Sequence, residues 1–472
     1  MTDPNVHVVH SSVSGDAYAS LRRRPTPRTE RFELGRRLRD DVPREALGTW
    51  VPRSGLPGQA DVVSLVTESH QGRDERLIPL RVARMTASPY GFLRGSAIVM
   101  AADLATLPST GITPVICGDA HVGNFGFYAS PERDLVIDLN DFDEAHPGPW
   151  EWDLRRLAAS IWVAGRQNGF TEEQCQAAVE SCARAYRDHI RELADQPLLS
   201  RSFQRVDVDR LQESTTNLAL HRGIERAVSR ARRRTSDRAL PRFATDEEGG
   251  DHRIVEEPPL ITHVGSEEFE HIAEALDEYL QTLAPHWRRV LGGYTLLDLA
   301  HKVVGVGSVG LRAFVALCEG SSPEDVLFLQ LKQARRSVIA PYVHGDSAWH
   351  AHQGQRVVEY QQALQTVSDP LLGWTTVDGR QYYVRQFRNM KGTLPLDDIG
   401  ADAMVDYVAV CGRLLAKGHA RTSGASMIAG YAGRGDKLEH AIAVFARSYA
   451  DQTEADHAAL IEAVRLGRID SA

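Results

Sequence analysis

Apolar residues recur at helical spacing along most of the chain. The clearest case runs from Trp150 to Ala164, where Trp152, Leu157, Ile161 and Trp162 fall on one face and predict an amphipathic helix. The same periodicity predicts helices within residues 31–41, 61–70, 96–107, 171–234, 267–291, 349–365 and 401–468. In the last of these ranges, helices alternate with turns that contain glycine.

Short apolar runs between turn residues predict strands at 115–116, 125–128, 135–139, 313–317, 326–332, 372–376 and 382–387. Asp378-Gly379 separates the last two runs and predicts a hairpin, because this dipeptide readily adopts the positive φ angles of a tight turn. Residues 303–310, followed by 313–317, have the pattern of a strand, a glycine turn and a second strand. Residues 84–95, which contain Ser88-Pro89, are expected to form a structured loop, and residues 239–259 a long loop.

The composition is that of a soluble globular protein. The 472 residues are 42% apolar and 25% charged, with a net charge of -9, which allows a core divided into two or three lobes and does not favour nucleic acid. Five scattered cysteines without a C-x-x-C pair indicate neither a zinc site nor a disulfide framework. Residues 1–30 are expected to be a flexible tail. Without a signal peptide or an apolar run of ~18 residues, we expect no membrane span and a cytoplasmic location.

The residues from Cys117 to Asn124 carry the strongest chemical signal. Asp119 and Asn124 stand five residues apart, the spacing with which protein kinases arrange a catalytic base and a metal ligand. Asp119 would accept or orient the proton of an attacking hydroxyl, and the amide oxygen of Asn124 would hold Mg²⁺. A polar loop in which the Asp and the Asn only cap turns is the alternative. His121 is expected to hold the loop in place.

A kinase-like site also needs a carboxylate from the next strand for the same metal ion. Asp138, Asp141 and Asp143 are the candidates. Asp141 is favoured because it precedes Phe142, as in an Asp-Phe-Gly motif. Asp138 ends the strand at 135–137, and Asp143 is a candidate ligand for a second ion.

The glycine turn near residue 305 and the strand after it predict a nucleotide site. Gly305, Gly307, Ser308 and Gly310 lie between two expected strands, where backbone N–H groups of a kinase cover the nucleotide phosphates. A dinucleotide fold, which needs a helix after the glycines, and a hairpin without a ligand are the alternatives.

Lys332 ends the following strand, as the phosphate-binding lysine of kinases does, and Glu359 on the next predicted helix is its expected partner. A lysine in water at the end of a strand is the alternative.

These motifs resemble those of the aminoglycoside-phosphotransferase and choline-kinase branch of the kinase superfamily. Residues 117–124 are similar to its H-G-D-x-H-x-x-N signature, with Cys117 in place of the first histidine, and residues 137–153 to its I-D-F-x-x-A…D-L-A signature. By this resemblance Asp153 braces the catalytic loop. Residues 88–95, 117–121 and 140–144 together also resemble an uncharacterised bacterial family known only as a domain of unknown function, over nearly the whole chain from about residue 30.

The order of the motifs differs from that of a kinase, because the glycines and Lys332 follow the catalytic loop. Circular permutation accounts for this, with the helix at Val408–His419 corresponding to the one that normally runs into the loop. The expected fold is therefore α+β, two-lobed, kinase-like and permuted, with a large helical insertion. Its expected parts are the tail (1–30), the first part of the C-lobe (31–170), the helical insertion (171–295), the nucleotide-binding N-lobe (296–395) and the remaining C-lobe helices (396–472).

The function expected from these residues is ATP- and Mg²⁺-dependent phosphoryl transfer to an unidentified hydroxyl. A nucleotidyltransferase, a nucleotide-sensing pseudoenzyme and a hydrolase built on the Asp/His cluster remain alternatives. The basic residues Arg84, Arg94, Arg385, Arg388 and Lys391 could each touch phosphate or an anionic substrate, although each alone fits a structural role. The basic run 230–234 fits a solvated helix face better than a nucleic-acid site. No oligomeric state and no particular acceptor is indicated.

Overall fold

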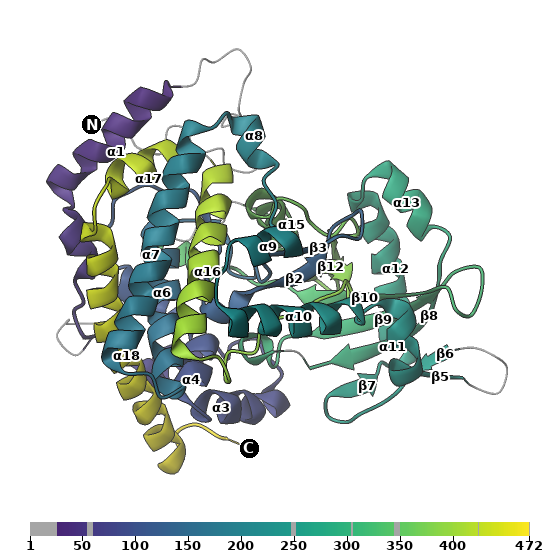
Figure 1. Ribbon diagram of the computed structural model, residues 1–472. Helices are drawn as coiled ribbons and strands as arrows, with labels where there is room; N and C mark the ends of the chain where they lie inside the picture. The colour runs from purple at the N-terminus through teal and green to yellow at the C-terminus, as the bar shows by residue number, and fades with distance from the viewer. Residues whose placement is uncertain are drawn as a thin grey trace.

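The computed structural model describes residues 26–53, 60–246, 252–303, 305–343, 350–422 and 424–471. It has a mixed α+β fold in which helices predominate and the sheets are small, in agreement with the expected class. Figure 1 shows a helical part on one side and the main sheet, with its own helices, on the other. Most of the tail predicted at residues 1–30 lies outside the described residues.

The helical part is built from both ends of the chain. Its helices are α1 (Arg28–Asp41), α2 (Val62–Glu68), α3 (Ile78–Thr86), α4 (Pro89–Gly95), α5 (Ala97–Leu104), α6 (Trp150–Gln167), α7 (Glu172–Asp195), α8 (Leu198–Ser202), α9 (Val208–Glu213), α10 (Leu218–Arg232), α16 (Ala401–Arg421), α17 (Ala425–Ala432) and α18 (Lys437–Arg465), with the short turns η1 (Arg44–Gly48) and η3 (Glu75–Leu77). α7 begins with a capping box between Thr171 and Gln174, which satisfies the first free N–H groups of the helix. It comes from the segment predicted to be an insertion, yet it packs in the core along α16 (Figure 1).

Short strands connect this part to the loops of interest. They are β1 (Val115–Ile116), β2 (Phe125–Ala129), β3 (Leu135–Leu139) and β4 (His146–Pro147), with the turn η4 (Val122–Asn124). β2 and β3, both predicted as strands, pair with each other, and β1 pairs with β4. The loops that follow β1 and β3 are therefore held close to each other.

The main sheet has six antiparallel strands in the order β11–β12–β10–β9–β8–β7. The strands are β7 (Ile261–His263), β8 (Thr295–Lys302), β9 (Ala313–Glu319), β10 (Val326–Gln333), β11 (Gly373–Val377) and β12 (Arg380–Gln386). The helices around this sheet are α11 (Ser236–Phe243), α12 (Ser266–Thr282), α13 (Pro285–Leu291), α14 (Ala340–Val343) and α15 (Gln353–Leu364). Asp378 and Gly379 have φ angles of 47° and 72°, so the predicted tight turn joins β11 to β12.

Side chains of β10 alternate between two apolar clusters. Leu327, Leu329 and Leu331 join the cluster under α12, whereas Val326 and Phe328 join the cluster on the other face. Lys332 continues the second set, because successive side chains of a strand point to opposite faces. The register places it directly opposite Tyr383 of β12.

The structure corrects three element predictions. Residues 84–95 are not a loop: Ser88 caps α4 through its hydroxyl, and Pro89 occupies the first helical position. Residues 239–259 contain most of α11 and the hairpin of β5 (Ala244–Asp246) and β6 (His252–Ile254), apart from 247–251, which lie outside the described residues. The strand before the glycines is β8, which ends at Lys302 rather than starting at 303. Within the described ranges, no helix has both the length and the apolar character needed to cross a membrane.

Candidate functional site

The loop after β1 is held by an aspartate on α6. The carboxylate of Asp153 accepts hydrogen bonds from the backbone N–H groups of Cys117 (2.7 Å) and Gly118 (2.9 Å). Its Oδ2 atom also lies 3.3 Å from Nε2 of His419, near the end of α16. Asp153 thus contacts the 117–124 loop, as the family resemblance implied.

Gly118 allows the loop to pass very close to the segment after β3. Its φ angle is +80°, and a Cβ atom there would lie 2.4 Å from the carbonyl oxygen of Glu144. The thiol of Cys117 donates to the carbonyl of Asp141 across the same contact, at 3.0 Å. The two loops are therefore packed against each other, and a side chain larger than glycine does not fit at position 118.

His121 has the structural role that the sequence indicated. Its Nδ1 atom accepts a hydrogen bond from the backbone N–H of Gly123 (3.2 Å). Burial, together with the positive charges of Arg94 and Arg156, lowers its pKa well below the ordinary value. A neutral His121 holds the turn that carries Asn124.

Asp119 lines a cavity of about 300 Å³ between the helical part and the sheet. Its Oδ1 atom accepts a hydrogen bond from Nε of Arg156 (2.8 Å), and Arg156 also donates to the carbonyl of Leu93 (2.6 Å). Burial raises the pKa of Asp119 to about 7, although Arg156 opposes this shift. We did not predict Arg156 from the sequence, but it follows Asp153 by three residues and so shares a face of α6 with it.

Asn124 and Asp141 are the predicted ligands of Mg²⁺, and of these two Asp141 lines the cavity whereas Asn124 does not. Nδ2 of Asn124 donates to the carbonyl of Asp119 (2.7 Å), which leaves its Oδ1 atom as the possible ligand. Asp141 lines the same cavity as Asp119. Among the described residues, no group of three or more His, Cys, Asp or Glu side chains could hold a metal ion. Two oxygen ligands nevertheless fit Mg²⁺, which usually keeps several waters and binds substrate phosphates.

Asp138 faces away from this cavity. It is 2% exposed and forms a buried ion pair with Lys417 of α16. Of the three predicted candidates, this pairing leaves Asp141 and Asp143, which line the cavity together with Glu144.

Asp143 connects the loop after β3 to the sheet. Its carboxylate lies 2.5 Å from Nζ of Lys332, accepts a hydrogen bond from the hydroxyl of Tyr383 (2.9 Å) and lies 3.4 Å from Oγ of Ser308. Burial alone would raise the pKa of Asp143, but Lys332 and Tyr383 hold it below the ordinary value. Burial also works against the charge of Lys332, yet Asp141 and Asp143 raise its pKa.

Glu359 is not the partner of Lys332 that we predicted. Its carboxylate bonds to Nε2 of His350 (2.8 Å) and Nε2 of Gln355 (2.8 Å) instead. The residue of α15 that reaches the acidic loop, the segment after β3 that contains Asp141, Asp143 and Glu144, is Arg356, one turn earlier. Arg356 donates to the carbonyls of Ala145 (2.5 Å) and Asp143 (2.7 Å), so α15 holds the loop through its backbone.

The predicted glycine segment lies between β8 and β9 and contains the turn η5 (Val306–Ser308). Gly307 and Ser308 line the cavity, whereas Gly305 and Gly310 do not. Gly310 has a φ angle of +85°, and its carbonyl accepts from the N–H of Asp74 (2.8 Å). Residue 304 lies outside the described residues. The segment is thus anchored to the loop between α2 and α3.

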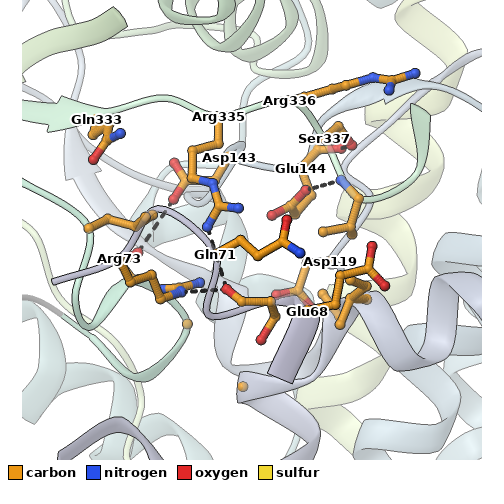
Figure 2. Close-up of a pocket in the computed structure, with 18 of the residues that line it drawn as sticks. Glu68, Gln71, Arg73, Asp119, Asp143, Glu144, Gln333, Arg335, Arg336 and Ser337 are labelled. Carbon is orange, nitrogen blue, oxygen red and sulfur yellow. Dashed lines mark hydrogen bonds between the residues drawn. The ribbon is translucent and has the colours of Figure 1, made fainter. Parts of the chain in front are cut away.

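Figure 2 shows Asp119, Asp143 and Glu144 around one cavity together with Arg73 and Arg335. These residues come from segments about two hundred positions apart in the chain. The fold therefore brings together the loop of Asp119, the loop of Asp141 and the glycine segment, with Lys332 behind Asp143.

Comparison with known protein families gives a match over most of the chain. A family model described as "Uncharacterized protein conserved in bacteria (DUF2252)" matches residues 73–463. No curated protein and no solved structure matches the chain.

Proposed function

We propose a function for a chain that belongs to the DUF2252 family of bacterial proteins: it transfers a phosphoryl group from ATP, with Mg²⁺, to a hydroxyl of an acceptor. One observation carries this proposal. A single cavity is lined by Asp119 and Asp141 and also by Gly307 and Ser308, with Lys332 joined to its edge through Asp143. A base, a metal-binding carboxylate and a phosphate-binding segment around one cavity are what phosphoryl transfer requires.

The arrangement of the sheet supports a kinase-like nucleotide lobe. The glycine segment joins β8 and β9, and Lys332 lies near the end of β10, the third strand counted from β8. The helix α15 comes later in the chain, before β11 and β12. Kinases use the same series of a glycine loop, a lysine on the third strand and a following helix. In this protein, Asp143 would take over the task of fixing the ammonium group, because Glu359 bonds elsewhere.

A contact between distant parts of the chain supports circular permutation. The backbone N–H of Val115, at the start of β1, donates to Oγ1 of Thr422, which follows α16 (3.2 Å). The end of α16 therefore lies beside the strand that leads into the Asp119 loop. In a kinase of ordinary order, a helix in this place would run directly into that loop, so the proposal includes a permuted, two-lobed fold.

The side chains have distinct tasks in the proposed reaction. Asp119, held at Oδ1 by Arg156, takes the proton of the acceptor hydroxyl with its other oxygen. The hydroxyl oxygen then forms a bond to the γ-phosphorus, the bond from that phosphorus to the bridging oxygen breaks, and ADP leaves. Asn124 and Asp141 would hold Mg²⁺, which offsets negative charge on the phosphates.

Labelled ATP tests this proposal. The purified protein is incubated with Mg²⁺, a bacterial small-molecule extract and ATP labelled in either the γ- or the α-phosphate. The proposal expects transfer of the γ label, lost in Asp119→Asn and kept in the control Asp195→Asn, whose carboxylate is 83% exposed. Transfer of the α label would instead indicate nucleotidyl transfer. No transfer of either label would contradict catalysis, and if nucleotide still binds, the protein is a nucleotide sensor.

A further inference from the structure

Five arginines line the cavity in addition to its carboxylates. Arg73, Arg81 and Arg94 come from the segment between α2 and α5, and Arg335 and Arg336 follow β10. Figure 2 shows Arg73, Arg335 and Arg336 around the space that Asp119 also borders. Binding of Mg²⁺ calls for oxygen ligands, so it does not account for these arginines.

Arg81 is a buried cation without an anion beside it among the residues that the structure describes. It is 1% exposed, and its one hydrogen bond runs from a terminal nitrogen, Nη2, to the carbonyl of Gly95 (2.7 Å). Its Nε and Nη1 atoms are buried and have no partner. The charged groups that act on it most strongly are Arg73 and Arg335, both positive. Because a buried guanidinium keeps its charge, its free donors call for an anion.

Arg94, which lines the same cavity as Arg81, also lacks a hydrogen-bond partner at one of its nitrogens. Its Nε atom is buried and has no partner among the described residues. Burial, and after it the charges of Arg81 and Arg73, lower the pKa of His70 to about 4. Arg73 itself is occupied, since it donates to the carbonyls of Ser69 (2.8 Å) and Val309 (2.6 Å).

Three of the five carboxylates among the described residues that line the cavity have partners of their own; the other two are Glu68, which is exposed, and Asp141, which helps to raise the pKa of Lys332. Asp143 pairs with Lys332, and Asp119 pairs with Arg156. Oε2 of Glu144 accepts from the backbone N–H of Val338 (2.7 Å). A ligand is therefore needed to satisfy Arg81 and Arg94.

The cluster is linked to the proposed base through the backbone. Arg156, which holds Asp119, donates to the carbonyl of Leu93, the residue before Arg94. Arg94 also stacks over Tyr90 at 5.9 Å, and Tyr90 packs edge-on against His121 in the Asp119 loop. An anion on Arg81 and Arg94 would thus be bound by the same unit that positions Asp119.

We propose that Arg81 and Arg94 form a subsite for an anionic group, phosphate or carboxylate, on the acceptor whose hydroxyl meets Asp119. The acceptor is then a small hydroxyl compound with a negative charge, rather than a neutral sugar or a cationic antibiotic. This identification of the anion as part of the acceptor rests on the proposed function. The presence of the anion site does not.

Calorimetric titration of the full-length protein with inorganic phosphate, at constant ionic strength and without nucleotide or Mg²⁺, tests the subsite. We expect saturable binding that Arg81→Met and Arg94→Gln each weaken at least tenfold. Binding should be unchanged in Arg76→Gln, a nearby control with an 89% exposed side chain. Absence of saturable binding, or equal binding in the two arginine variants, would overturn the proposal. Loss of phosphate binding in Lys332→Met, with binding kept in both arginine variants, would also overturn the proposal, because the phosphate would then bind at the proposed nucleotide site.

Thermal unfolding separates an anion site from a structural role. Phosphate should raise the melting temperature of the wild type and leave that of Arg81→Met unchanged, since the variant lacks the unneutralised charge. If Arg81→Met does not fold, Arg94→Gln, at a half-buried position, decides the matter. A separate titration with ATP and Mg²⁺ distinguishes the two hypotheses. If the protein binds phosphate but no nucleotide, the proposed function is contradicted and the subsite is not. If it binds nucleotide but no phosphate at the arginines, the subsite is contradicted and the proposed function is not.

Discussion

Asp143 is the residue whose surroundings differ most from the sequence expectation. The sequence suggested it as a ligand for a second metal ion. In the structure its carboxylate is bonded by Lys332 and Tyr383 and lies beside Ser308, so it joins three segments of the sheet part to the helical part. The kinase pattern pointed to Lys332, but sequence spacing alone could not show which acid would reach it.

Replacing Lys332 with methionine should destabilise the fold through Asp143. The variant leaves a mostly buried carboxylate without its cation, so we expect the free energy of unfolding to fall by ~3 kcal/mol. Asp143→Asn in the same background should recover part of that loss, because it removes the unpaired charge. Urea unfolding of both variants measures the effect, and an equal or lower stability in the double variant would contradict the pairing.

Asp103 should make stability depend on pH. It shares Arg53 with Asp456, accepts from Tyr449 (2.8 Å), and burial raises its pKa to about 7. The folded protein then keeps a proton that the unfolded chain has released above a pH of about 4. The free energy of unfolding should therefore fall as the pH rises from about 4 to 7, by at most ~1.4 kcal/mol per unit from this group.

Asp103→Asn should remove this contribution. Urea unfolding of the wild type and the variant at several pH values between about 5 and 8 measures it, and the variant should gain stability relative to the wild type as the pH rises. A stability difference that is the same at every pH would contradict the protonated state of Asp103.

The two loops that meet at the cavity depend on close backbone packing. Gly118 has a positive φ angle and no room for a Cβ atom, whereas Gly379, in the β11–β12 turn, has a φ of +72° and nothing within 4 Å of its Cβ position. Gly379→Ala should cost only the strain of the left-handed conformation, ~1 kcal/mol. Gly118→Ala should cost at least twice as much, since the loops must also separate. Equal losses in urea unfolding would show that the loops are not in contact.

Most helices and strands follow from the spacing of apolar residues, and the exceptions have physical causes. Ser88-Pro89 suggested a loop, but a serine cap followed by proline also starts a helix, and the pattern does not distinguish the two. Glu359 was the residue of α15 chosen for Lys332, yet Arg356, one turn earlier, faces the acidic loop. The orientation of a helix about its axis depends on tertiary packing, which periodicity constrains only loosely.

The chain as a whole folds so that segments from its beginning, middle and end meet at one cavity. The motifs at 117–124, 137–144 and 305–332 could be found from the sequence, because each is local. The sequence could not show that the arginines of the cavity lie together. Arg81 and Arg94 lie on separate helices, α3 and α4, and each alone resembles a solvated or structural residue. Arg94 was one of several basic candidates in the sequence, and the buried, unpartnered nitrogens of Arg81 and Arg94 identify the two together.

The most direct test of the account is the binding of nucleotide. Isothermal titration calorimetry of the full-length protein with ATP and Mg²⁺ should show binding that Lys332→Met and Asp141→Asn each weaken at least tenfold and that Asp195→Asn leaves unchanged. Absence of binding for ATP, GTP and ADP with either Mg²⁺ or Mn²⁺ would contradict the central claim, and so would equal affinity in the wild type and both site variants.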